Sequence, residues 1–456
     1  MKIVLLAGSS NQNLWPLANR GRADQFVPLL EHPSGGRESS TQRIWRQLER
    51  ADLQENAYIA AGIGQTELVH KQLGTGAPVI KEPAERGTYS AALLSAAYLH
   101  SIVGLSMNEV IVFIPANIYV GQSFFDCVRS LPKLLRSSSS QLILIGVKAG
   151  EQERPGSKGV IITESGGEEA DFCSKVIAYN GKPQDKEAIR LQRAGALLHS
   201  GAFAFRLGSM IDKLMEEGLP VRYEELFKIY ARLEPRSCRD YIGSGAEASV
   251  IEYSGEWKEL GTWEAVAEYV PNGRNGKLMG CGKQTVLLNE LDVPLSVCGL
   301  SDTVVAASRE GILVANLASL ERKRLADLIP VKDTTEMPMS EDRRWGKAEV
   351  LSRIHYGDGH EAAVKLMRMR AGEHLDYELH LRRDEKWTIL NGEAELMLDE
   401  CCSRVKTGDT VDIPARARHS MRALTDLEWV ELQLGPGISQ PEDQIVISTV
   451  WEEIRS

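Results

Sequence analysis

This sequence lacks a cysteine pattern that is typical of disulfide bonds. Its seven cysteines are an odd number, and no two of them have the Cys-x-x-Cys spacing of a zinc or redox motif. This pattern excludes a disulfide framework and indicates a reducing compartment. We therefore expect a cytoplasmic protein.

Long apolar runs are missing as well. No stretch of about 20 apolar residues, the length that crosses a bilayer, occurs in the chain. The first apolar run ends at Ala7 and is followed by polar residues, which is not the pattern of a secretory signal. These absences argue against membrane insertion.

Positive charge is scarce. The chain has 53 lysines and arginines against 63 aspartates and glutamates, a formal net charge of −10. This balance argues against binding to nucleic acid or to an anionic membrane surface. A phosphorylated ligand would therefore need a locally basic pocket.

The 456 residues are enough for about three domains of ~150 residues each. Apolar segments at residues 1–6, 57–61, 110–114 and 142–147 predict strands, and helical patterns at residues 41–50 and 90–101 alternate with them. This alternation predicts an α/β fold with a doubly wound sheet. Near residues 271–276 the pattern changes to short strands, which marks the expected main boundary.

The first predicted strand leads into the tight turn Gly8-Ser9-Ser10-Asn11. Backbone N–H groups in such a turn can approach a phosphate. A Gly-Ser turn after a first strand is also an ordinary connection, and this segment alone does not decide between the two. Matches elsewhere in the chain favour phosphate binding.

The opening resembles that of the mannose-1-phosphate guanylyltransferases, especially the long type fused to a mannose-6-phosphate isomerase domain. The family's loop arginine falls on Asn13 and its following lysine on Asp24. Neither residue can neutralise the charge that develops as pyrophosphate leaves. The family opening L-A-G-G-S-G-T-R-L-W-P-L-S-R, followed by P-K-Q-F, is matched at Leu6, Ala7, Gly8, Ser10, Leu14, Trp15, Pro16, Leu17, Gln25 and Phe26.

Further segments carry the same resemblance. Residues 82–88, Glu-Pro-Ala-Glu-Arg-Gly-Thr, are similar to E-P-x-G-R-N-T, and residues 115–118, Pro-Ala-Asn-Ile, are similar to P-A-D-H. Residues 182–183 match K-P, residues 199–203 resemble N-S-G-M-F, and residues 257–263 resemble W-S-D-V-G-S-W. The order of these segments along the chain supports the nucleotidyltransferase fold.

The resemblance implies a role for each position. Arg86 is the expected catalytic residue, and Glu259 is the expected Mg²⁺ ligand. Asn117 replaces the family's other metal-binding aspartate by a neutral side chain. The implied nucleotide or sugar contacts are Leu6, Ala7, Gly8, Ser10, Asn13, Gln25, Glu82, Thr88, Asn117, Lys182, His199 and Gly201.

The last third of the chain has the spacing of a cupin barrel. Alternating segments at residues 394–398 and 410–414 predict strands of a jelly roll. The cupin motif positions are Gly372, Glu378, His380, Glu385, Gly392, Gly408, Pro414 and His419.

Resemblance to the isomerase domain implies a metal site in this barrel. The implied ligands of Zn²⁺ or another divalent metal are Glu378, His380, Glu385 and His419. Arg383 and Lys365 are the implied catalytic or phosphate-binding cations. A metal-free cupin in which these side chains form ion pairs is the alternative.

We expect three domains. Residues 1–270 form the nucleotidyltransferase-like domain, residues 271–335 a short β connecting region, and residues 336–456 the cupin. The β-helix-like character of the connecting region is implied by the resemblance alone.

Three functional hypotheses remain open. The first is an active guanylyltransferase that transfers GMP from GTP to mannose 1-phosphate with Mg²⁺. The second is a metal-dependent cupin isomerase with a silent transferase domain. The third is a catalytically impaired paralogue that binds a sugar nucleotide or regulates an active relative. All three imply a small nucleotide or sugar phosphate as partner, and all allow a homo-oligomer or pairing with an active paralogue.

Overall fold

The computed structural model describes residues 1–148, 159–164, 173–181, 183–243, 247–270, 276–280, 282, 284–322, 338–438 and 443–454. Among the predicted site residues, Lys182 lies outside the described residues. The chain divides into two units, Met1–Asn11 with Ala23–Pro271 and Gln12–Arg22 with Asn272–Ser456. The three-domain division remains a prediction.

The first unit is built on a mixed nine-stranded sheet. The strand order is β5-β4-β1-β6-β11-β8-β12-β10-β9, with β5, β4, β1 and β6 parallel and β11 antiparallel to both of its neighbours β6 and β8. The predicted strands at residues 1–6, 57–61, 110–114 and 142–147 are confirmed. The bounds are β1 (Lys2–Leu6), β4 (Ala57–Gly62), β5 (Val79–Glu82), β6 (Val110–Pro115), β8 (Leu142–Val147), β9 (Val160–Thr163), β10 (Ser174–Asn180), β11 (Leu197–Arg206) and β12 (Ala248–Tyr253).

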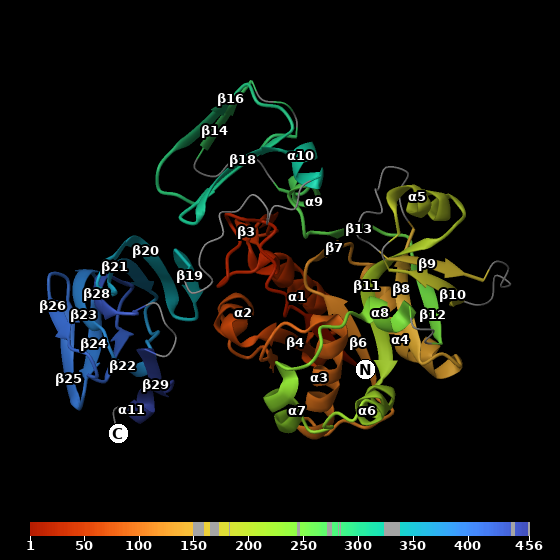
Figure 1. Cartoon of the computed structure of the whole chain (residues 1–456), viewed down its shortest axis with the longest axis horizontal. Helices are drawn as coiled ribbons and strands as arrows, with labels where there is room; N and C mark the ends of the chain where they lie inside the picture. Colours follow the sequence, from red (N-terminus) through yellow and green to blue (C-terminus); the bar gives the residue numbers. More distant parts are fainter. Residues whose placement is uncertain are drawn as a thin grey trace. The chain divides into compact units, whose positions relative to one another are not determined.

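Helices cover both faces of this sheet (Figure 1). Side chains alternate along β1, so Ile3 and Leu5 pack with α1, α2 and α4, while Val4 packs with α3, α6 and α7. This arrangement confirms the doubly wound α/β fold. The bounds are α1 (Ser40–Arg50), α2 (Thr66–Leu73), α3 (Gly87–Ser101), α4 (Phe124–Ser137), α6 (Leu207–Glu216) and α7 (Tyr223–Tyr230).

Short elements complete the first unit. Two antiparallel pairs lie outside the large sheet, β2 (Leu30–Glu31) with β3 (Arg37–Glu38) and β7 (Ile118–Val120) with β13 (Trp257–Glu259). The short helices are η1 (Asp24–Phe26), η2 (Gln54–Asn56), η3 (Ile63–Gln65), α5 (Asp185–Arg193), α8 (Cys238–Gly243) and α9 (Trp263–Ala267).

The second unit begins with short stacked strands. Parallel pairs form between β14 (Gly276–Met279) and β16 (Leu295–Cys298) and between β15 (Val286–Asn289) and β17 (Thr303–Ser308). The hairpin partner of β17 is β18 (Gly311–Asn316), which leads into α10 (Leu317–Arg322). These two parallel strand pairs enclose a small core that contains Leu287, Val297 and Val305. Their stacking agrees with the β-helix-like region implied by the resemblance.

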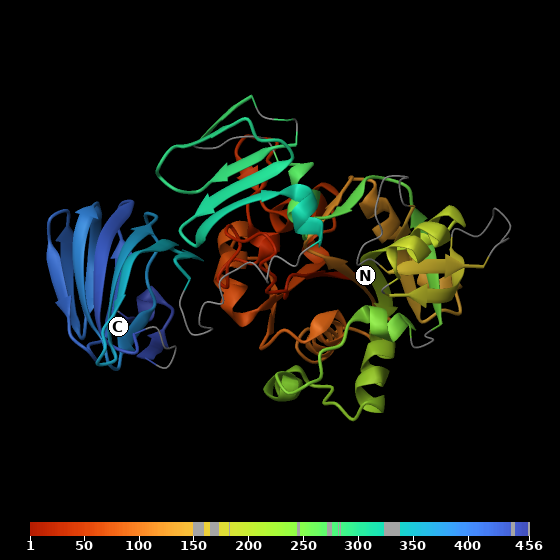
Figure 2. The same ribbon diagram turned by 45° about the horizontal axis from the view of Figure 1, so that its top comes forward.

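The rest of the second unit is a jelly-roll barrel, drawn in blue in Figure 2. Its core takes Trp387 and Trp429 from one sheet and Leu396 and Met421 from the other, which confirms the cupin fold. One sheet contains β19 (Ser340–Arg343), β20 (Gly346–His355), β21 (His360–Met369), β28 (Leu427–Pro436), β23 (Asp384–Asn391) and β26 (Thr410–Ile413). The other contains β25 (Cys401–Lys406), β24 (Glu393–Leu398), β27 (His419–Ala423), β22 (Tyr377–His380) and β29 (Gln444–Ser448), and α11 (Trp451–Ile454) follows.

Among the helices in the described ranges, none has the length and apolar character that crossing a membrane requires.

Candidate functional site

A cleft of about 950 Å³ opens in the first unit. Residues far apart in the sequence meet there because the parallel strands β1 and β6 end at the same edge of the sheet. Three predicted residues that are described, Ala7, Ser10 and Arg86, are not among its lining residues, and Asn13 belongs to the other unit. The predicted residues that line the cleft are Leu6, Gly8, Gln25, Glu82, Thr88, Asn117, His199, Gly201 and Glu259.

Gln25 holds the turn that follows β1. Its buried Nε2 donates hydrogen bonds to Ala7 O at 2.7 Å and to Ser9 O at 2.8 Å. Its own carbonyl accepts from the Thr41 hydroxyl at 2.9 Å, near the start of α1. The Gln25 side chain therefore fixes the backbone of the turn through two of its carbonyl groups and does not use the N–H groups of the turn.

Glu82, the last residue of β5, lies directly against the turn. A Cβ on Gly8 would clash with the carboxyl group of Glu82, so a larger residue at position 8 would require that carboxyl group to move. Burial, reinforced by the nearby Glu85, raises the pKa of Glu82 to about 8. Glu82 Oε1 has no hydrogen-bond partner among the described residues. At neutral pH, Glu82 therefore lines the cleft as a protonated carboxyl group whose Oε1 can still form a hydrogen bond.

The Glu85 carboxylate binds the turn that follows β1. Its carboxylate accepts hydrogen bonds from the backbone N–H of Ser10 at 3.2 Å and from the Ser10 hydroxyl. The resemblance assigns this turn to phosphate, and a phosphate oxygen would have to replace the Glu85 carboxylate there. Sequence comparison placed a family glycine at this position, so the substitution has a direct structural effect.

Asn117 and Glu259, the two expected metal positions, come together. The short strands β7 and β13 pair Ile118 with Glu259, and Asn117 Nδ2 lies 3.5 Å from Glu259 Oε1. The Asn117 carbonyl also accepts from Leu260 N at 2.7 Å. An amide oxygen and a carboxylate are both hard ligands, so the pair fits Mg²⁺ with less negative charge than two carboxylates would supply.

His199 lines the cleft from the bulged part of β11. Burial, with a smaller effect of Arg239, lowers the pKa of His199 to about 3, so the ring is neutral. Its Nδ1 lies 3.4 Å from the Tyr179 hydroxyl, and its Nε2 has no partner among the described residues. The ring therefore offers a neutral hydrogen-bonding group to a ligand.

Arg86 points away from the cleft lining. Its Nε donates to Ala231 O at 3.1 Å, and its Nη2 donates to the same carbonyl. The cleft instead takes positive charge from Arg236 and Arg239, which the sequence analysis missed. Arg236 is paired with Glu217. No motif marks these arginines, and contacts between distant segments bring them to the cleft, among them Arg236 N to Arg86 O at 2.9 Å and Tyr89 N to Arg236 O at 3.1 Å.

A second cluster lies inside the cupin barrel. Glu378, His380 and His419 each offer one ligand atom, and these atoms lie within 4.8 Å of one another. His419 Nδ1 lies 3.1 Å from Ala417 O, which leaves Nε2 for the cluster. Burial lowers the pKa of both histidines, so both are neutral and fit a metal ligand.

Glu385 lies beside this cluster and is already well occupied. Its Oε1 accepts from Arg383 Nε and Gln433 Nε2, both at 3.0 Å, and its Oε2 accepts from Trp387 Nε1 at 3.1 Å. The same Oε1 lies 3.2 Å from His380 Nε2. Glu385 is therefore close enough to join the ligand set, and in this structure it positions Arg383.

Lys365 and Glu431 face each other across paired strands of the barrel. Burial lowers the pKa of Lys365. Burial and the Glu385 charge raise the pKa of Glu431 to about 7. The sequence analysis identified Lys365 and missed Glu431, because a single glutamate on an alternating strand carries no motif.

Comparisons with known proteins give matches to the cupin and to nearly the whole chain. Residues 332–448 match the family model described as the C-terminal domain of mannose-6-phosphate isomerase. Mannose-1-phosphate guanylyltransferase of Sinorhizobium fredii is 25% identical, over 97% of this chain and 90% of that protein. Alginate biosynthesis protein AlgA of Pseudomonas aeruginosa is 22% identical, over 96% and 95% respectively.

A solved structure supports the fold of a large part of the chain. It is described as mannose-1-phosphate geranyltransferase from Thermus thermophilus, and it covers 72% of this chain and 98% of its own at a TM-score of 0.57 and 23% identity. The fold and the two clusters define a sugar nucleotidyltransferase-type domain joined to a cupin. Over nearly its whole length the chain is similar to proteins named mannose-1-phosphate guanylyltransferase, and its cupin is similar to the C-terminal domain of mannose-6-phosphate isomerase.

Proposed function

We propose that the first unit transfers GMP from GTP to mannose 1-phosphate and forms GDP-mannose and pyrophosphate. The observation that carries this proposal is the cleft itself, where family positions from distant segments converge in about 950 Å³. That volume suits a nucleotide with its sugar. The names of the full-length relatives supply the guanine base and the mannose.

The proposed reaction is a single displacement. A phosphate oxygen of mannose 1-phosphate attacks the α-phosphorus of GTP, and the bond to the β-phosphate oxygen breaks as pyrophosphate leaves. Gln25 fixes the turn that faces the phosphates, and neutral His199 faces a sugar hydroxyl. Asn117 and Glu259 would hold Mg²⁺, which neutralises phosphate charge when bound.

The test is pyrophosphate release from GTP and mannose 1-phosphate. We expect slow turnover by the natural chain, because Asn117 supplies no negative charge to the proposed Mg²⁺ position. The variant Asn117→Asp should be faster, because it adds a carboxylate beside Glu259. The proposal of transfer fails if neither protein releases pyrophosphate.

A second candidate is a catalytically impaired paralogue that binds a sugar nucleotide. The contact between Glu85 and Ser10 favours it, because a carboxylate holds the turn where phosphate would bind. Tight GDP-mannose binding with no pyrophosphate release by the natural chain would select this candidate. Calorimetry and the release assay on the same preparation separate the two.

The cupin is the proposed site of a divalent metal, with Zn²⁺ as the first choice for a set with two imidazoles. Glu378, His380 and His419 would hold the metal, which supplies Lewis acidity when bound. Arg383 and Lys365 would face the phosphate of a sugar phosphate. Metal analysis and mannose 6-phosphate isomerisation by the purified full chain test this assignment.

A further inference from the structure

The segment Gln12–Arg22 links the turn after β1 to the second unit. It leaves the first unit after Asn11 and returns at Ala23. Within the first unit, Asp24 N donates to Asn11 O at 3.1 Å and closes the base of the segment. The residues that directly follow the predicted phosphate-binding turn therefore belong structurally to the C-terminal half.

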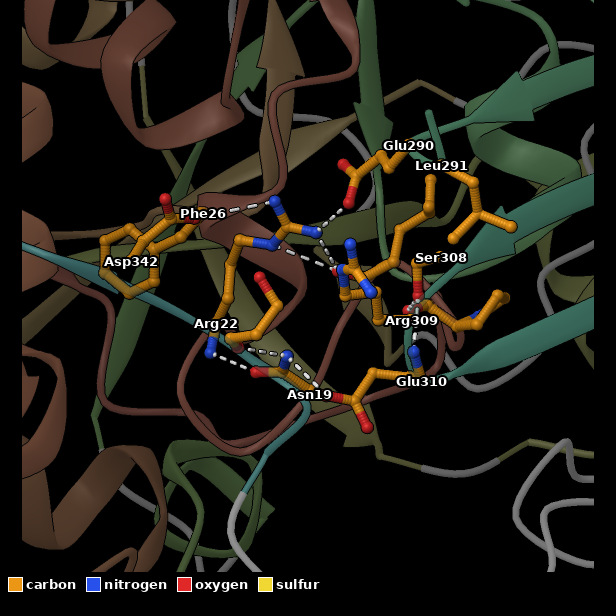
Figure 3. Close-up of polar contacts among 12 residues, drawn as sticks. Asn19, Arg22, Phe26, Glu290, Leu291, Ser308, Arg309, Glu310 and Asp342 are labelled. Carbon is orange, nitrogen blue, oxygen red and sulfur yellow. Dashed lines mark hydrogen bonds and ion pairs between the residues drawn. The ribbon is translucent and has the colours of Figure 1, made fainter. Parts of the chain in front are cut away.

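Arg22 makes the strongest attachment in this segment (Figure 3). Its nearly buried guanidinium donates to Leu17 O from Nε at 3.0 Å and from Nη2 at 2.6 Å. Nη2 also lies 2.6 Å from Glu290 Oε2, and Nη1 lies 3.5 Å from Asp342 Oδ2. Burial opposes the charge, but these carboxylates outweigh it and raise the pKa of Arg22. One side chain thus closes the segment and joins it to the connecting region and to strand β19 of the cupin.

Asn19 makes the second attachment, beside Glu310 in Figure 3. Its Oδ1 accepts from the backbone N–H groups of Gly21 and Arg22, both at 2.9 Å. Its Nδ2 donates to Glu310 Oε1 at 3.1 Å and to Ser340 O at 3.0 Å. The amide therefore satisfies donors within the segment and acceptors outside it at the same time.

Two backbone contacts reinforce the attachment. Ser308 Oγ donates to Pro16 O at 2.6 Å. A Cβ on Gly311 would lie 2.5 Å from Cζ2 of Trp15, so the indole packs directly on the glycine backbone. The segment is therefore held along its length, at Trp15 and Pro16 as well as at Asn19 and Arg22.

Strand β19 joins this attachment to the cupin wall. Ser340 and Asp342 on one face of β19 contact the segment. Glu341 lies on the opposite face, the one shared with Lys365, because Glu341 pairs with Ala348 and Lys365 pairs with Val350. The segment is thus bonded to β19, and Glu341 on the other face of β19 shares a face of the sheet with Lys365, a residue of the proposed sugar-phosphate site on β21.

The geometry points to Arg22 and Asn19 as positioning residues for the nucleotide cleft, acting from the second unit. This inference rests on the proposed nucleotide site. Arg22 precedes Gln25 by three residues, and Gln25 is the side chain that holds Ala7 O and Ser9 O. A shift of the segment at Arg22 is therefore passed along the chain to the residue that shapes the turn.

The experiment compares full-length Arg22→Met with the matched control Arg20→Met, an exposed arginine of the same segment. Hydrogen exchange measured by mass spectrometry should rise about tenfold in peptides covering residues 7–25 of Arg22→Met only. GDP-mannose affinity should fall about tenfold in Arg22→Met and remain unchanged in Arg20→Met. Metal content of the cupin should be the same in both proteins.

Further variants separate positioning from general destabilisation. Arg22→Lys keeps the charge but has one ammonium in place of the three guanidinium nitrogens that contact Leu17 O, Glu290 and Asp342, so we expect an intermediate loss of affinity. Where turnover is measurable, KM for GTP should rise more than kcat falls. Glu290→Gln and Asn19→Ala give the same readouts if Arg22→Met does not fold.

The results that overturn the inference are specific. The positioning role is rejected if hydrogen exchange and GDP-mannose affinity in Arg22→Met equal those in Arg20→Met. If Arg22→Met does not fold, the same result in Glu290→Gln and Asn19→Ala rejects it. Absence of nucleotide binding by the natural chain would reject the proposed function instead, and the exchange comparison would still decide whether Arg22 positions the turn.

Discussion

Glu82 allows a quantitative test of the electrostatics in the cleft. Replacing it by glutamine keeps the size and most hydrogen-bonding capacity of the side chain and removes its ionisation. Burial and the neighbouring Glu85 raise the pKa of Glu82 from 4.5 to about 8 in the folded protein. The folded state therefore binds this proton more tightly than the unfolded state does.

The sign of the pH dependence follows from that difference. The proton stabilises the folded state fully below about pH 4.5, and this stabilisation is lost as pH rises from about 4.5 to about 8. At about 1.4 kcal/mol for each pH unit, the free energy of unfolding of the natural chain should fall by about 2.5 kcal/mol relative to Glu82→Gln between about pH 5 and pH 7. Above about pH 8 the difference should level off.

Pulse proteolysis in urea at several pH values, with peptides of the first unit quantified by mass spectrometry, measures this difference. Comparison with Glu82→Gln cancels the titration of all other groups. A Glu85→Gln control should show a shallower slope, because it removes a charge that raises the pKa of Glu82. A difference that stays constant to within about 0.5 kcal/mol from about pH 5 to pH 8 would refute the reasoning.

Three further predictions concern the two candidate sites. Glu85→Gln should bind GDP-mannose about tenfold more tightly by calorimetry, because it removes a negative charge beside the turn and leaves a weaker acceptor for the Ser10 N–H; unchanged affinity would show that the turn does not meet phosphate. Asn117→Asp should bind Mn²⁺ more tightly in the cleft by electron paramagnetic resonance, because it adds a carboxylate beside Glu259; equal affinity would remove the pair as a metal site. His380→Ala should lose the bound metal by elemental analysis while Lys365→Met retains it, and full retention in His380→Ala would contradict the proposed ligand set.

Much of the fold was predictable from the sequence because its signals are local. Continuous apolar runs such as residues 110–114 belong to strands buried on both faces, and alternating runs such as residues 394–398 belong to a barrel wall. The spacing of the cupin motif positions identified Glu378, His380 and His419, and the pairing of β22 with β27 places Glu378 opposite His419.

The parts of the sites that were missed depend on contacts between distant segments. Arg239 reaches the cleft only through the path of the chain after α7, and Glu431 faces Lys365 only through strand pairing. Arg86 had the right motif, yet the Ala231 carbonyl, which lies 145 positions away in sequence, sets its direction. Motif spacing cannot report such contacts because they are made by tertiary packing.

The path of Gln12–Arg22 also limits how this gene can be divided. A fragment that stops near residue 271 would keep the segment but lose Ser308 and Gly311, leaving the Pro16 carbonyl unpaired and the Trp15 ring uncovered. A fragment that starts there would leave the carboxylates of Glu290 and Asp342 without their arginine. A division near residue 271 would therefore need a redesigned segment, whereas a division near residue 335 would keep Glu290, Ser308 and Gly311 with the segment and remove its contacts with strand β19.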